Sequence, residues 1–152
     1  ANEDVAMAIA RTLLSLVLGA LFVFIGLNKA FPLNPDMTKE FATKVPTWLS
    51  VFPLTKAELL PAPAAIQFQG FIGGLEVMAG ALSVLSVLLG SASLGKYAAL
   101  GLAAIMAGAV YTHVALGEMA KPEASAPSAV FLALLLLRVT MGGSRSAKEH
   151  SD

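Results

Sequence analysis

The sequence predicts an all-α, multi-pass membrane protein: a four-helix bundle with a long structured loop between its first two helices. Hydrophobic residues make up 57% of the 152-residue chain and charged residues 13%, with a mean hydropathy of +0.76. Soluble domains contain about 25% charged residues. Four apolar segments approach the roughly 20 residues that a spanning helix needs. All eight prolines fall between the first and second segments or between the third and fourth.

The four predicted spans belong to a single membrane domain, residues 1–152, and cover residues 5–31, 64–89, 94–116 and 127–141. Residues 142–152 form a polar tail. The fourth span is short, but Arg138 near its end can snorkel to the membrane interface and lengthen it. With four crossings, both proline-rich loops lie on one side of the membrane, and both termini lie on the other.

The loop of residues 32–63 is too long to be a simple connector. Asn34 precedes a proline and an aspartate, an arrangement typical of a helix start. The apolar residues after it repeat every four positions, at Met37, Phe41 and Val45. This pattern predicts a short amphipathic helix on the membrane surface that ends at Pro46. Beyond it, Trp48 and Phe52 are predicted interfacial anchors, with a partner-docking patch as the alternative.

Helices in lipid associate through small residues that let their backbones approach. Three predicted seams carry such residues at heptad spacing: Thr12, Ser15, Gly19, Phe22, Gly26 and Lys29; Gln69, Gly73, Glu76, Gly80 and Ser83; and Tyr97, Gly101, Ala104, Gly108, Tyr111 and Ala115. Gly70 and Gly74 form a further pair, available to this chain or to a partner subunit, with internal packing the favoured use. The fourth span has no comparable seam and is expected to face lipid or a neighbouring protein.

Glu76 is the strongest candidate for a functional group, because a carboxylate at membrane depth is costly and usually finds a partner or marks function. Judged by depth along the helices, Tyr111 ranks first as its partner and Lys29 second. These three residues form the predicted buried polar cluster. We favour a hydrogen-bonded carboxylate that fixes helix register. Proton or quinone chemistry is the alternative, and it lacks a second acid in the spans.

His113 should point away from the seam that carries Tyr111, since two residues correspond to more than half a helical turn. One interpretation is an interfacial histidine bonded to the following loop or to lipid headgroups. The alternatives are a ligand to a pigment magnesium or a contact to a partner chain. Glu118 and Glu123 in the following loop are interpreted as solvated charges.

Several functional classes are excluded by composition. The chain has no cysteine, which removes disulfides, thiolate metal sites and iron–sulfur clusters. Ten basic residues balance ten acidic ones, so no net field attracts nucleic acid. No catalytic constellation or metal site is recognisable. We therefore predict no catalytic residue and no intrinsic cofactor, with a bound lipid, pigment or quinone left open.

Three stretches, GALFVFIGLNKAF, IGGLEVMAGAL and AGAVYTHVALGE, resemble the DoxX-like family of four-helix membrane proteins. The family patterns Gly-x-x-Lys and Gly-x-x-Glu-x-x-x-Gly are matched by Gly26, Lys29, Gly73, Glu76 and Gly80. The long first loop is closer to the eukaryotic transmembrane-35-like branch, which includes a chaperone for acetylcholine-receptor assembly. The bacterial branch includes a subunit associated with thiosulfate:quinone oxidoreduction.

The resemblance implies a small bundle that accompanies other membrane proteins. The expected function is a non-enzymatic accessory or assembly subunit of a photosynthetic or respiratory complex, in contact with lipids and other membrane subunits. The alternatives are a quinone-linked oxidoreductase subunit that uses Glu76 with Lys29 or Tyr111, and an assembly chaperone. The chain begins at Ala1, as in a trimmed sequence or a mature organellar protein. The second interpretation predicts a thylakoid or mitochondrial inner membrane.

Overall fold

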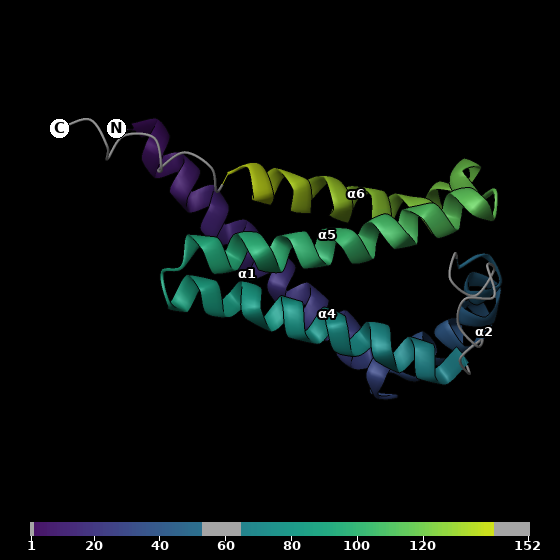
Figure 1. The fold of residues 1–152 in the computed structure, drawn as a ribbon. Coiled ribbons are helices and arrows are strands. Elements are labelled where there is room, and N and C mark those ends of the chain that lie inside the picture. Colours follow the sequence, from purple (N-terminus) through teal and green to yellow (C-terminus); the bar gives the residue numbers. More distant parts are fainter. Residues whose placement is uncertain (1, 53–64, 142–152) are drawn as a thin grey trace.

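The computed structural model describes residues 2–52 and 65–141, and these form an all-α bundle (Figure 1). Within them, four helices are long and apolar enough to cross a membrane: α1 (Asn2–Ala30), α4 (Ala65–Leu88), α5 (Ala92–Ala115) and α6 (Pro122–Thr140). The predicted fold class is confirmed. The predicted tail and the second part of the predicted loop, residues 53–63, lie outside the described residues.

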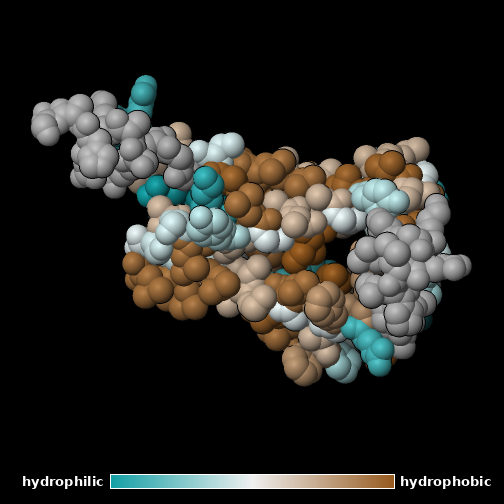
Figure 2. Space-filling view, viewed as in Figure 1, coloured by the Kyte–Doolittle hydropathy of each residue, from teal (hydrophilic) through white to brown (hydrophobic). Residues whose placement is uncertain are grey.

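Two shorter elements complete the described chain: α2 (Pro35–Val51) and the 3₁₀ helix η1 (Glu118–Ala120). They lie at one end of the bundle, which we call the α2 end (Figure 1). The opposite end, the turn end, holds the beginning of α1, the end of α6 and the tight turn between α4 and α5. Gly90 in that turn has a φ of 62°, which glycine adopts without steric cost. The outward surface of the helices is largely hydrophobic (Figure 2), as a lipid-facing surface requires.

α1 and α4 approach each other with backbone against backbone. A Cβ atom added to Gly73 would stand 2.6 Å from the carbonyl oxygen of Gly26, and one on Gly80 would stand 2.7 Å from that of Gly19. Only glycine permits this distance. The buried residues of the two helices include the central members of both predicted seams: Ser15, Gly19, Phe22 and Gly26 on α1, and Gly73, Glu76, Gly80 and Ser83 on α4. These two predicted seams are confirmed.

The predicted seam on α5 is wrong. All six of its residues, from Tyr97 to Ala115, are exposed. The helix packs through another face, whose buried members are Gly95, Ala98, Ala99, Leu102, Ala103, Met106 and Thr112. α5 has alanine or glycine on every side, so residue size did not distinguish its faces.

The fourth span also differs from its prediction. α6 begins at Pro122 rather than at residue 127, because proline suits the first helical turn and Glu123 complements the helix dipole there. The helix was expected to face lipid or a neighbouring protein, but α6 packs along α5, and its Leu135 is 1% exposed. Arg138 does not snorkel outward. Its side chain is buried, and its Nε donates to Ser15 Oγ at 2.6 Å.

α2 does not end at Pro46 but continues to Val51. Proline removes one N–H from the helical ladder, yet α2 continues through Pro46 and packs against α4 and α5. The predicted start is confirmed, since Asn34 Oδ1 accepts hydrogen bonds from two backbone N–H groups of the first turn. Val45, on the apolar face of α2, is 2% exposed, so this face is turned towards the bundle.

We expect Gly73→Ala to destabilise the bundle by at least about 1–3 kcal/mol, because the new methyl group meets the carbonyl of Gly26. Gly74→Ala is the matched control, since a Cβ there meets nothing within 4 Å. It should be neutral or slightly stabilising. Thermal unfolding of the purified variants in detergent measures both effects. Equal melting temperatures for Gly73→Ala and Gly74→Ala would contradict the backbone contact.

Candidate functional site

A cavity of about 420 Å³ lies at the α2 end of the bundle. α1 packs on α4 and α6 packs on α5, but α1 and α6 make little contact with each other. The two helix pairs therefore separate towards α2, which lies across the opening (Figure 1). The surface is hollowed between them (Figure 2). Residues from α1, α2, α4 and α5 line the cavity.

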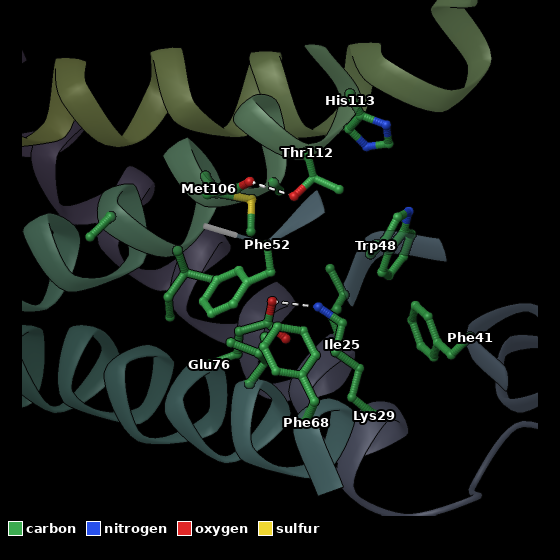
Figure 3. A pocket seen from close by; sticks show the side chains of 15 residues that line it. Ile25, Lys29, Phe41, Trp48, Phe52, Phe68, Glu76, Met106, Thr112 and His113 are labelled. Carbon is green, nitrogen blue, oxygen red and sulfur yellow. Dashed lines mark hydrogen bonds and ion pairs between the residues drawn. The ribbon is translucent and has the colours of Figure 1, made fainter. Parts of the chain in front are cut away.

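The cavity wall is apolar and rich in aromatic rings. Phe41, Trp48, Phe52 and Phe68 gather around it (Figure 3). The rings of Phe52 and Phe68 meet edge to face with centroids 5.2 Å apart. Such pairs add specific geometry to the burial of apolar area. Polar groups are few: Lys29, Glu76, Thr112 and His113.

Lys29 and Glu76 form an ion pair inside the cavity (Figure 3). Lys29 Nζ donates to Glu76 Oε1 at 2.6 Å, and the two side chains are 13% and 0% exposed. Lys29 lies in the last turn of α1, where the helix dipole favours a cation. The Lys29 amine also lies 5.6 Å from the centroid of the Phe41 ring, a cation–π distance.

The ranking of Tyr111 above Lys29 as the partner of Glu76 is wrong. Tyr111 is 44% exposed and does not line the cavity. Side chains on a helix tilt towards its N-terminus, and from Lys29 that direction leads into the bundle. The lysine therefore reaches deeper than its backbone position. Tyr111 was also placed on the α5 face that turns out to be exposed.

Two polar atoms of this region are buried without a hydrogen-bond partner: Glu76 Oε2 and Asn28 Oδ1. Asn28 Nδ2 donates to Phe24 O at 2.8 Å, and Gln69 Nε2 donates to Lys29 O at 3.1 Å. The second bond ties the start of α4 to the end of α1. Because most buried polar atoms are paired, the open lone pairs of Glu76 are the notable feature. The carboxylate can accept a further hydrogen bond.

Trp48 and Phe52 were predicted to anchor the chain at the membrane surface, and instead they point into the cavity (Figure 3). Trp48 meets His113 at a centroid distance of 6.4 Å. The apolar spacing of α2 is visible in the sequence and predicted a face in contact with lipid, whereas in the structure this face covers the cavity. An amphipathic stripe does not say whether lipid or protein covers it.

His113 is bonded to the following loop, as one of its interpretations predicted. Its Nδ1 lies 2.7 Å from Glu118 Oε2, so Glu118 is paired and not simply a solvated charge. The described residues hold no group of three or more histidines and acids that could bind a metal ion. A pigment ligand or partner contact at His113 stays a prediction.

The glycines of the spans divide into two groups. Gly19, Gly26, Gly73 and Gly80 pack at the α1–α4 contact. Cβ atoms added to Gly70, Gly74 and Gly108 would meet nothing within 4 Å, and one on Gly101 would only touch Ala79 at 4.0 Å. The expected internal use of Gly70 and Gly74 is therefore wrong within the described residues.

Sequence reasoning missed Phe41, Phe68 and Thr112 as members of the site. Phe41 precedes Trp48 by seven residues on α2, a spacing that places both on one face, and this was the available signal. The sequence contains no comparable signal for Phe68 or Thr112. No protein-family model matches the chain.

Lys29→Met should destabilise the protein by about 3–5 kcal/mol, because it leaves the Glu76 carboxylate buried without its cation. The double variant Lys29→Met/Glu76→Met should recover most of that loss, since no buried charge is left. Lys44→Met is the control. It breaks the exposed pair with Glu40 on α2, and such pairs contribute under about 1 kcal/mol. Thermal unfolding in detergent compares the parent and the three variants. A melting temperature of Lys29→Met equal to that of the parent would contradict the buried pair.

Proposed function

We propose that the protein is a membrane accessory subunit that binds a ligand of the quinone class in the cavity at the α2 end. The observation that carries this proposal is an apolar, aromatic-walled cavity in which hydrogen-bonding groups enter from two sides. Lys29 and Glu76 come from α1 and α4, and His113 comes from α5. Cavities of this composition are the usual sites for small, mostly apolar ligands.

The size of the cavity is consistent with a single ring system. Its volume of about 420 Å³ lies in the range of roughly 300–1,000 Å³ for small-molecule pockets. The rings of Trp48, Phe41 and Phe68 offer flat apolar surfaces against which a planar head can pack. A long isoprenoid tail would extend between the helices into lipid.

The polar groups match both redox forms of a quinone head. The Lys29 ammonium is a donor and suits a quinone carbonyl. Glu76 Oε2 lacks a partner and can accept from a quinol hydroxyl. His113 uses Nδ1 towards Glu118, so in the neutral imidazole the other ring nitrogen is an acceptor for the second hydroxyl.

We also propose that the chain belongs with the DoxX-like proteins. The ion pair supports this assignment, because the lysine and the glutamate of the two family motifs are direct partners. A quinone ligand agrees with the bacterial branch, which includes a subunit associated with thiosulfate:quinone oxidoreduction. The thylakoid or mitochondrial inner membrane stays a prediction.

Trp48 is the only tryptophan of the chain and lines the cavity, so its fluorescence reports on binding there. Titration of the purified protein with a short-tailed benzoquinone should quench this fluorescence saturably. Gly108→Phe should weaken binding by about tenfold or more, because Gly108 lines the cavity and has open space beside it. Gly74→Phe, also open but outside the cavity lining, should bind as the parent does.

Saturation by a tail alcohol without a ring, or by a sterol in place of the quinone, would assign the cavity to another lipid. Linear quenching that both glycine variants share would indicate collisions only and would reject the cavity as a binding site.

A second candidate is an assembly role, either as a fixed subunit or as a chaperone. It is favoured by the exposed small residues Gly101 and Ala115 of α5, which lie outside the cavity lining. Small residues on an outer face let another membrane helix approach closely. Gly70 and Gly74 add a similar open surface on α4.

Gly101→Phe tests the assembly role without entering the cavity, because Gly101 is exposed and is not part of the cavity lining. In native gels of solubilised source membranes, it should shift the protein from a high-mass complex to its free form. Val130→Phe, at an exposed position of α6, should leave the complex intact. A parent protein that migrates alone would argue against this role, whatever the cavity binds.

A further inference from the structure

A second, smaller pocket lies at the turn end of the bundle, away from the cavity. Arg11 and Ser15 of α1, Ser86 of α4 and Arg138 of α6 contribute to its lining. The remaining wall includes Ser91, which is the N-cap of α5. Its volume is about 80 Å³. Its lining is therefore polar and basic, in contrast to the aromatic cavity.

Arg138 is buried here with unused hydrogen-bonding capacity. The residue is 2% exposed, its Nε donates to Ser15 Oγ at 2.6 Å, and its Nη1 is buried with no partner. The absence of a side chain at Gly95 leaves room for the guanidinium, since a Cβ at Gly95 would collide with Arg138 Nη2. An unsatisfied buried donor of a charged group is costly and calls for an acceptor.

Within the part of the chain that the structure describes, no acidic side chain pairs with the arginines of this pocket. Among the described residues, ion pairs join Lys29 to Glu76, Lys44 to Glu40 and His113 to Glu118, and none of them involves an arginine. Arg11 and Arg138 therefore face one pocket without a carboxylate. The N-terminus of α5 at Ser91 and Ala92 adds the positive end of a helix dipole. Each of these features favours an anion.

We propose that this pocket binds a phosphate group, carried by an anionic membrane lipid or present as free phosphate. The guanidinium fork matches phosphate oxygens. A pocket of about 80 Å³ is larger than the roughly 10–15 Å³ that one water molecule needs but far too small for an acyl chain, so a compact anion such as a phosphate group suits it. Arg138 lies close to the end of α6 at Thr140, where lipid headgroups meet a spanning helix. The site is independent of the quinone proposal.

The test uses the full chain in detergent, with native mass spectrometry against phosphatidic acid, phosphatidylcholine and inorganic phosphate as separate probes. Phosphatidic acid should bind one per chain and more tightly than phosphatidylcholine. Arg11→Gln should weaken that binding about tenfold or more, through loss of one charge-assisted contact. Lys96→Gln is the control, because it removes a charge from α5 near the same end but lies outside the pocket lining.

Arg138→Gln should abolish binding, provided that its helical circular dichroism and elution volume match those of the parent. If it fails to fold, Arg11→Gln decides, since Arg11 is not a member of the buried core. Binding of the lipid that inorganic phosphate does not displace assigns the source to the membrane. Binding of inorganic phosphate alone assigns it to free phosphate. If neither phosphatidic acid nor inorganic phosphate binds, or if Arg11→Gln and Lys96→Gln lose equal binding, the proposal is overturned.

Discussion

The direct backbone contact between α1 and α4 is the constraint on which both polar sites depend. Gly26 meets Gly73, and Lys29 and Glu76 each follow one of these glycines by three residues. Because α1 and α4 run antiparallel, these offsets point in opposite directions, and the two side chains meet because each tilts towards the N-terminus of its own helix. At the turn end, Ser83 Oγ of α4 donates to Ser15 O of α1 at 3.0 Å. Ser15 is thereby held where Arg138 reaches it.

The second helix pair gives these groups their surroundings. α5 packs on α6 along its length but on α4 more closely towards the turn end, so the bundle is closed at one end and open at the other (Figure 1). The closed end buries a guanidinium, and the open end leaves a cavity that α2 covers with aromatic rings. A cation and an ion pair are costly inside an apolar bundle. They persist here at opposite ends, the ion pair inside the aromatic cavity and Arg138 beside the small polar pocket.

The candidate site could be predicted in part. Glu76 stood out because one carboxylate interrupted an apolar run, and the seams on α1 and α4 carried a consistent small-residue rhythm that the structure confirms. The prediction of Tyr111 as its partner was wrong, because the backbone position of Lys29 understates the depth that its side chain reaches along α1. The prediction of the packing face of α5 was wrong because alanine and glycine occur on all sides of that helix. Neither the partner of Glu76 nor the buried face of α5 can be read from residue type alone.

The sequence by itself determined the class of protein, the number of spans and the glycines of the α1–α4 contact, because apolar length, proline placement and small-residue spacing are local properties. Only the tertiary structure decided that α2 turns its aromatic face inwards, that Arg138 is buried, and that Lys29 is the partner of Glu76. Those outcomes depend on where helices far apart in sequence meet. An amphipathic helix requires an apolar surface and a buried cation requires an acceptor, and the tertiary fold decides which residues provide them.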